Sequence, residues 1–319
     1  MTAPSRAAGA RVNLSVLLCT VDRPQRARQV VTDVLAQWQD GVAELVIVDQ
    51  SAEALALPTL PSDAVVHHLR AGRVGLPRAR NIALDVASSG LCLFVDDDVR
   101  LLPGFISSHR AAFEDPAVGV SVGRLVERYA RPNSWRRDNR VDLLGRVHTQ
   151  LGALESGPVG VAKGANMAFR SEPLRQAGGF DARYAGNALL EDADASERMR
   201  RAGWSVRFEP QAELVHLSEP AGGVRQGSDE RTAWWRFHNT ALFVSLYRRR
   251  TLALSRMAHR ALAVRLALRS RNPGLIAQLN EAFESGVNAA GMPRQGYVQG
   301  DSLRYAQRHE HTSMLDATE

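Results

Sequence analysis

The sequence has few cysteines, one lysine and no long apolar run. Cys19 and Cys92 are the only cysteines among 319 residues, and each lies in a short apolar segment. This usage predicts two buried, reduced thiols and excludes a small secreted fold built on disulfides. No stretch approaches the ~18 consecutive apolar residues that span a bilayer, and residues 1–11 lack the apolar segment of a signal peptide. We therefore expect a cytoplasmic protein whose residues 1–11 are disordered.

Glycine is missing where a dinucleotide-binding fold needs it. The first apolar run, Leu14 to Cys19, is followed by Thr20-Val-Asp-Arg-Pro24. A nicotinamide-binding Rossmann fold has a glycine-rich turn at this point, because the backbone must approach a pyrophosphate. A dehydrogenase is therefore excluded. The chain also carries no helix-turn-helix, zinc-finger or RNA-recognition motif, so no nucleic-acid partner is expected.

The composition is that of a globular protein with unevenly placed charge. Hydrophobic residues make up 45% and charged residues 23%, which predicts a packed core. The net charge is +6, yet eleven arginines stand against only Asp229 and Glu230 between Arg225 and Arg271. The basic charge is therefore concentrated in one C-terminal segment.

Short apolar runs alternate with amphipathic segments in the first hundred residues. Strands are predicted at 14–19, 44–49, 64–69 and 91–95, and helices from Pro24 to Gly41 and from Pro77 to Ser88. Such alternation indicates βαβ units and a mostly parallel sheet, in which ligands bind outside the carboxyl ends of the strands. Thr20, Asp49 and the triplet Asp96 to Asp98 all fall at such ends.

The acidic triplet Asp96-Asp97-Asp98 follows the buried run Leu91 to Val95 directly. Carboxylate oxygens are the ligands of hard divalent cations, and Mg²⁺ is usually shared between carboxylates and substrate phosphates. The alternative is a solvated loop with an acidic cap for the next helix.

Two groups of motifs resemble a family 2 glycosyltransferase of the GT-A type. Its nucleotide-binding half is matched by Leu14 to Pro24, Glu44 to Ser51, Gly75 to Leu84 and Phe94 to Asp98; its acceptor half is matched by Gly164 to Arg170, Gly178 to Asp181, Glu191 to Asp194, Gly203 and His216. The resemblance covers about two thirds of the chain, from Val12 to Leu217.

The resemblance implies an α/β protein with a GT-A, Rossmann-like sheet, mixed but mostly parallel and flanked by helices. The implied glycosyltransferase domain is 12–224, with a nucleotide-sugar half at 12–100 and an acceptor half at 101–224. A mostly helical extension follows at 225–319.

The resemblance also implies roles for individual residues. Thr20, Arg23 and Asp49 would hold the nucleobase, and Arg80, Asp96 and Asp97 the rest of the nucleotide. Lys163 and Asn166 stand in the segment that lines the donor sugar, although a tight turn explains that segment equally well. Asp96, Asp98 and His216 would hold a divalent metal, Mg²⁺ or Mn²⁺, with a purely structural histidine as the alternative.

The segment from Glu191 to Ala202 is predicted to be a helix that ends at Gly203. By the resemblance Asp192 is the general base, and Glu191 orients the acceptor or the base. Carboxylates also favour a helix N-terminus for electrostatic reasons alone. Asp194 remains a third candidate for the base.

The expected reaction is metal-dependent, inverting transfer of a hexosyl group from a nucleoside-diphosphate sugar to a hydroxyl of a glycan, lipid-linked or small-molecule acceptor. The chain lacks the Q-x-x-R-W motif of processive synthases, so addition of one or few sugars is expected. The alternatives are a catalytically silent sugar-nucleotide-binding scaffold and a nucleotidyltransferase.

The arginine-rich segment from Thr232 to Ser270 is predicted to form helices with an apolar stripe. That stripe packs on the catalytic domain, or the basic surface binds anionic lipid at the inner face of the membrane. A second copy of the chain, in a homodimer, is a further candidate partner.

Overall fold

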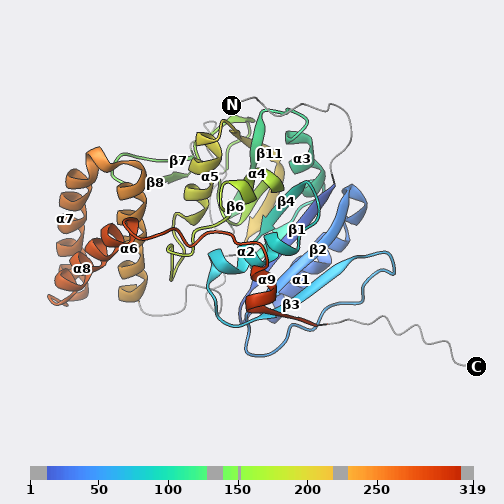
Figure 1. The fold of residues 1–319 in the computed structure, drawn as a ribbon, viewed down its shortest axis with the longest axis horizontal. Helices are drawn as coiled ribbons and strands as arrows, with labels where there is room; N and C mark the ends of the chain where they lie inside the picture. The colour runs from blue at the N-terminus through green and yellow to red at the C-terminus, as the bar shows by residue number, and fades with distance from the viewer. Residues whose placement is uncertain (1–12, 128–138, 150–151, 218–228, 310–319) are drawn as a thin grey trace, which may run out of the picture.

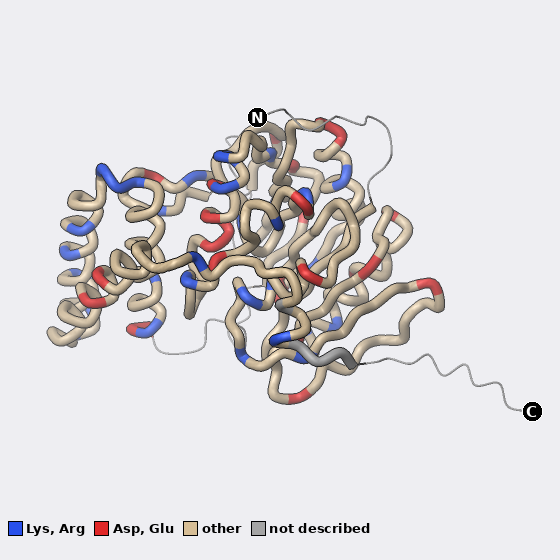
Figure 2. The backbone as a smooth tube through the Cα atoms, in the orientation of Figure 1, with Lys and Arg blue, Asp and Glu red and all other residues tan. Residues whose placement is uncertain are grey.

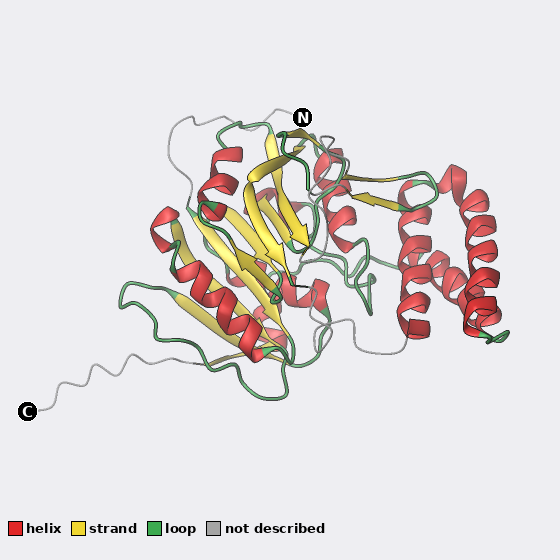
Figure 3. Cartoon of the chain, turned by 180° about the vertical axis from the view of Figure 1, so that it is seen from behind, coloured by secondary structure: helices red, strands yellow, loops and turns green. Residues whose placement is uncertain are grey.

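The computed structural model describes residues 13–127, 139–149, 152–217 and 229–309. A sheet covered by helices on both faces forms one part of the molecule, and a bundle of three helices lies beside it (Figures 1 and 3). The predicted disordered segment 1–11 and the predicted domain boundary at 224 lie outside the described residues.

Within the described ranges, the central sheet is built from ten strands. They are β1 (Leu14–Thr20), β2 (Val42–Asp49), β3 (Val66–Ala71), β4 (Leu91–Val95), β5 (Val99–Leu101), β6 (Val118–Glu127), β9 (Gly157–Pro158), β10 (Asn166–Arg170), β11 (Ser205–His216) and β12 (Ala306–His309). The order is β12-β3-β2-β1-β4-β10-β6-β11-β5, with β9 paired to β11. A separate hairpin consists of β7 (Asn139–Val141) and β8 (Val147–Thr149).

The sheet is mixed, as expected, and its longest ladders are parallel. β1 runs parallel to β2 and β4, and β6 runs parallel to β11. β10 runs antiparallel to β4, with Asn166 opposite Val95. The segment before β10 therefore meets the carboxyl end of β4, where the acidic triplet begins.

Helices α1 (Pro24–Leu35), α2 (Leu76–Val86), α3 (Phe105–Ala112), α4 (Ser171–Gln176) and α5 (Glu191–Arg201) accompany the sheet. α1 starts at Pro24, whose fixed φ suits a first helical turn. The prediction that this helix reaches Gly41 is wrong. It ends at Leu35, and a 3₁₀ turn at Trp38–Asp40 precedes Gly41, which adopts φ +95°. The extra turn keeps Trp38 packed against the core.

The C-terminal region is helical, as expected, but its end returns to the sheet. α6 (Asp229–Tyr247), α7 (Leu252–Ser270) and α8 (Leu275–Ala290) pack around Phe237, Leu279 and Phe283. The chain then runs back along the sheet-containing part, where the Tyr297 amide donates to the Gly178 carbonyl at 2.7 Å (Figure 1). After α9 (Asp301–Tyr305), β12 pairs antiparallel with β3. The extension therefore completes the edge of the sheet beside β3.

Cys19 and Cys92 are both buried and form no disulfide, as predicted. Among the helices of the described residues, none combines the length and apolar character needed to cross a membrane.

Candidate active site

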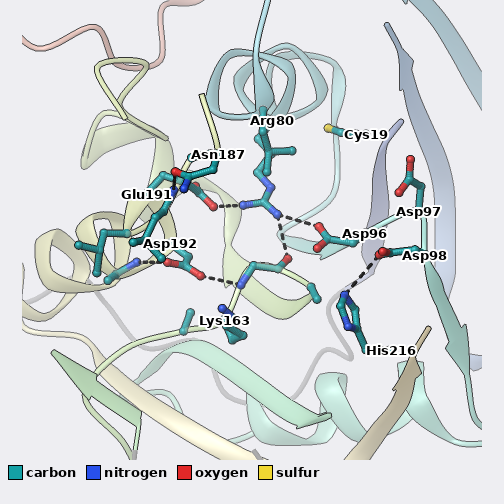
Figure 4. Close-up of a pocket in the computed structure, with 18 of the residues that line it drawn as sticks. Cys19, Arg80, Asp96, Asp97, Asp98, Lys163, Asn187, Glu191, Asp192 and His216 are labelled. Carbon is teal, nitrogen blue, oxygen red and sulfur yellow. Dashed lines mark hydrogen bonds and ion pairs between the residues drawn. The ribbon is translucent and has the colours of Figure 1, made fainter. Parts of the chain in front are cut away.

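A cavity of about 490 Å³ opens at the carboxyl ends of β1 and β4 (Figure 4). This volume lies within the range typical of small-molecule sites. Its walls come from the ends of both strands, from α2, from the segment before β10 and from the start of α5. The sequence-predicted residues that line it are Thr20, Arg23, Arg80, Asp96, Asp97, Asp98, Lys163, Glu191, Asp192 and His216.

Strand pairing brings His216 to the acidic triplet. β11 runs antiparallel to β5, and His216 lies opposite Val99, the residue that follows Asp98. His216 Nε2 is 3.4 Å from Asp98 Oδ1 (Figure 4). One potential ligand atom from each of Asp96, Asp98 and His216 lies within 4.8 Å of the other two. Two carboxylates and one imidazole form a donor set that suits a divalent cation such as Mn²⁺.

The middle aspartate of the triplet holds the loop that follows β1. Thr20 Oγ1 and Arg23 Nη1 each donate to Asp97 at 2.8 Å. Arg23 Nη1 also lies 3.1 Å from Asp98 Oδ2. Burial raises the pKa of Asp97 to about 6, although the Arg23 guanidinium opposes that rise. Asp97 therefore links the first strand's end to the metal-binding candidates.

Arg80 of α2 joins three walls of the cavity. Its buried guanidinium donates to the Gly164 carbonyl at 2.9 Å, to Asp96 Oδ1 at 3.1 Å and to Glu191 Oε1. A Cβ on Gly164 would lie 2.9 Å from Arg80 Nη2, so a side chain there would displace the guanidinium. Glycine at this position allows the arginine to reach both carboxylates.

The loop before α5 carries unusual backbone conformations. Ala188 and Leu190 have φ of +52° and +74°, although neither is glycine. Residues held in this region cost of order 1–3 kcal/mol each and concentrate at functional sites. Both residues line the cavity, and Leu190 immediately precedes the first carboxylate of α5. The strained loop therefore sets the direction in which α5 enters the site.

The first two residues of α5 have different surroundings. Glu191 is buried; one oxygen pairs with Arg80, and Oε2 has no hydrogen-bond partner among the described residues. Burial raises the pKa of Glu191 to about 8, and the charge of Arg80 opposes this. Asp192 is partly exposed and accepts from the Gly164 amide at 2.8 Å and the Ala193 amide at 2.7 Å. Backbone amides thus fix Asp192, whereas a guanidinium fixes Glu191.

Asp49, predicted to hold the nucleobase, does not line the cavity. Its carboxylate is fully buried and accepts from the Ser51 amide at 2.9 Å, the Leu55 amide at 2.8 Å and Arg70 Nη1 at 3.0 Å. Although burial alone would raise its pKa, hydrogen bonds from His68, Ser51 and Leu55 hold the pKa of Asp49 well below its usual range. In this structure Asp49 orders the loop after β2.

Asn166, predicted to contact the donor sugar, does not line the cavity. Its side chain is buried outside the cavity and bonds to His109 Nε2 at 2.7 Å and to the carbonyls of Arg124 at 2.9 Å and Ala212 at 3.0 Å. Successive side chains of a strand point to opposite faces, and Asn166 faces the packed interior. It joins β6, β10 and β11 and is a structural residue.

Several lining residues had no signal in the sequence. Cys19 and Gln50 come from the ends of β1 and β2, residues 187–190 precede α5, and Val147 and Thr149 come from the β7–β8 hairpin. Burial raises the pKa of the Cys19 thiol to about 12, so it is no nucleophile at neutral pH. Gln50 Oε1 accepts from the amides of residues 74 and 75 at 3.1 Å and shapes the rim.

The charges of the lining favour a bound cation. Four carboxylates, at positions 96, 97, 98 and 192, and the carboxyl group of Glu191 face Arg23, Arg80 and Lys163. Two of the three strongly basic groups already pair with carboxylates. An anionic diphosphate therefore needs additional positive charge to enter this cavity.

Curated relatives match parts of the chain. The pre-mycofactocin glycosyltransferase of Mycobacterium tuberculosis is 30% identical over 153 residues, covering 48% of this chain and 32% of that protein. The N-acetylglucosaminyl-diphospho-decaprenol L-rhamnosyltransferase of the same species is 31% identical over 93 residues, covering 25% of this chain and 30% of that protein. The chain spans about a third of the length of these relatives.

The fold is also similar to that of a solved glycosyltransferase. The mannosyltransferase PcManGT from Pyrobaculum calidifontis, in complex with GDP-Man and Mn²⁺, superimposes with a TM-score of 0.52 over 87% of this chain and 88% of that one, at 16% identity. The model of the family described as "Glycosyl transferase family 2" matches residues 15–178, slightly more than half of the chain. The chain therefore belongs to glycosyl transferase family 2.

Proposed function

We propose that this protein is a metal-dependent, inverting glycosyltransferase that moves a sugar from a nucleoside-diphosphate sugar to a hydroxyl acceptor. The observation that carries the proposal is the cluster of Asp96, Asp98 and His216 at the carboxyl end of β4. It shares one cavity with Arg80 and with the two carboxylates of α5.

The donor set supports a divalent cation. A cation bound there would neutralise the charge that develops on the departing diphosphate. Imidazole is a ligand typical of transition metals, whereas Mg²⁺ prefers oxygen ligands, so Mn²⁺ is favoured over Mg²⁺. The mannosyltransferase of similar fold was solved with Mn²⁺ and GDP-Man, which supports the same pairing of metal and donor class here.

Asp192 is the proposed general base. An acceptor hydroxyl becomes a better nucleophile when a positioned carboxylate takes its proton as it attacks the anomeric carbon. Asp192 is partly exposed to the cavity and fixed by two backbone amides, which suits this role. Glu191 pairs with Arg80 and acts as a positioning residue for that arginine.

The partial similarity to a rhamnosyltransferase named for a decaprenol-linked substrate supports a lipid-linked or cell-envelope glycan acceptor. Thr20, Arg23, Asp97 and Lys163 face the same cavity and are proposed to contact the nucleotide sugar.

The test is to identify the products formed from UDP-, GDP-, dTDP- and CDP-sugars with Mn²⁺. Release of a nucleoside diphosphate together with a glycosylated acceptor supports the proposal. Release of pyrophosphate would instead assign nucleotidyl transfer. Donor binding without any release, to acceptor or to water, would assign a silent binding protein.

A further inference from the structure

Helix α7 carries an apolar stripe that faces solvent. Leu254, Met257, Val264 and Leu268 are 58%, 67%, 43% and 75% exposed, and Ala261 between them is also exposed. Their spacing alternates between three and four residues, which puts all five on one face of the helix. The opposite face, with Ser255, His259, Ala263 and Ala267, is buried. The stripe is therefore additional to the face that holds α7 in the bundle.

α7 carries arginines and no acidic residue. Arg260 and Arg265 flank it on its two sides, and Arg269 follows one turn later. Figure 2 shows several basic residues along the outer helix of the bundle. No acidic residue occurs between Thr251 and Pro273. Arg256 pairs with Glu284 of α8 at 2.8 Å, whereas Arg260, Arg265 and Arg269 form no ion pair with any residue that the structure describes.

A second copy of the chain is a poor occupant of this face. Two α7 helices packed through the stripe would place Arg260 and Arg265 beside the same arginines of the other copy, in parallel and in antiparallel arrangements alike. Like charges at such positions destabilise helix pairs. The occupant should instead combine negative charge with an apolar layer.

We propose that α7 docks the protein on an anionic phospholipid surface. A helix lying in the interface buries its apolar face at the boundary between headgroups and acyl chains, while flanking arginines contact anionic headgroups. The stripe and the arginines of α7 match these two layers. This inference goes beyond the proposed sugar transfer and does not depend on it.

The docking helix is bonded to one wall of the active-site cavity. Thr251 Oγ1 donates to the Leu143 carbonyl, and Ser255 Oγ donates to the Leu144 carbonyl at 2.9 Å. Both carbonyls belong to the turn of the β7–β8 hairpin, whose residues 147 and 149 line the cavity. Docking through α7 therefore fixes the cavity relative to the lipid surface, as a lipid-linked acceptor would require.

The test is co-sedimentation of the full chain with vesicles of phosphatidylcholine alone or mixed with phosphatidylglycerol. Binding is expected only to the mixed vesicles, and it should weaken as salt is added. The double variant R260Q/R265Q should lose roughly 25-fold in the partition coefficient, about fivefold for each arginine near the surface. Leu268→Ser should lower the partition coefficient roughly tenfold, because the leucine no longer contacts the acyl chains. All three positions are exposed, so both variants should unfold at the temperature of the unmodified protein.

Matched controls test whether binding depends on this face of α7 rather than on the total charge or the number of exposed apolar side chains. R28Q/R304Q removes the same net charge from α1 and α9, and Leu303→Ser removes a side chain that is 86% exposed on α9. Both should bind vesicles normally. Absent binding at low salt, or an equal loss in these controls, would overturn the proposal. The proposal would also be overturned if the protein formed a dimer that Leu268→Ser converts to monomers. Binding of a DNA duplex as tightly as the vesicles would overturn it too.

Discussion

Replacing Asp192 by asparagine is expected to stop sugar transfer while leaving the donor bound. A general base contributes about 10²–10⁴ in rate, so the barrier should rise by about 3–5 kcal/mol. The asparagine has one acceptor oxygen where the carboxylate uses two, for the amides of Gly164 and Ala193. One hydrogen bond is lost, at about 1–2 kcal/mol of folding stability, which a typical domain tolerates.

The assay measures nucleoside diphosphate released with acceptor present, and calorimetry measures donor binding with Mn²⁺. Turnover should fall at least ~100-fold, and the dissociation constant of the donor should stay close to that of the unmodified protein. Glu172→Gln is the matched control, because Glu172 also lies in the first turn of a helix but is exposed and outside the cavity. Near-normal turnover in the Asp192 variant would refute its assignment as the base and direct the search to Glu191 or Asp194.

Three further substitutions test other contacts. His216→Ala should weaken Mn²⁺ binding by about tenfold or more and reduce the preference for Mn²⁺ over Mg²⁺, as measured by titration of the donor-bound protein; unchanged affinity would contradict the ligand assignment. Burial would raise the pKa of Glu44, but hydrogen bonds from His67 and neighbouring hydroxyls lower it to about 2. The Glu44 carboxylate therefore stabilises the folded protein fully above its unfolded pKa near 4.5, and this contribution is lost as the pH falls towards 2. Glu44→Gln should therefore lower the free energy of unfolding by about 2 kcal/mol at pH 7, and denaturant titrations should show the difference shrinking in acid; a constant difference would refute this. Tyr247→Phe removes the hydrogen bond from the α6 hydroxyl to the buried Asp194 carboxylate and should cost about 1.5–3 kcal/mol in thermal unfolding; an unchanged melting temperature would show that this bond contributes nothing.

The parts of the fold that were predicted well have strong local patterns. β4 was predicted with the observed bounds, because its five apolar residues stop at the acidic triplet. α5 starts at Glu191, as predicted from its acidic first turn, and ends one residue before the predicted end, ahead of Gly203. β3 was displaced by two residues, because its bounds depend on pairing with β2 and β12. That pairing involves a segment more than two hundred residues later, which no local pattern reveals.

The same distinction holds for the site. The cluster of Asp96, Asp98 and His216 was predicted because each residue follows an apolar run, and strand ends gather at one edge. The sequence did not reveal that Asn166 lies outside the cavity, because the direction of its side chain depends on the register of β10 with β4 and β6. The β7–β8 hairpin and the loop before α5 reach the cavity through tertiary packing alone, so their residues carried no sequence signal.

The central claim is that Asp96, Asp98 and His216 hold a cation that binds the diphosphate of a sugar donor. The most direct measurement is a crystal structure with Mn²⁺ and a nucleotide sugar, with the metal located by anomalous scattering. The account predicts one strong anomalous peak, from a metal ion coordinated by these three side chains and by both phosphates. A donor bound with its phosphates elsewhere, or an anomalous map without a peak among these three residues, would contradict it.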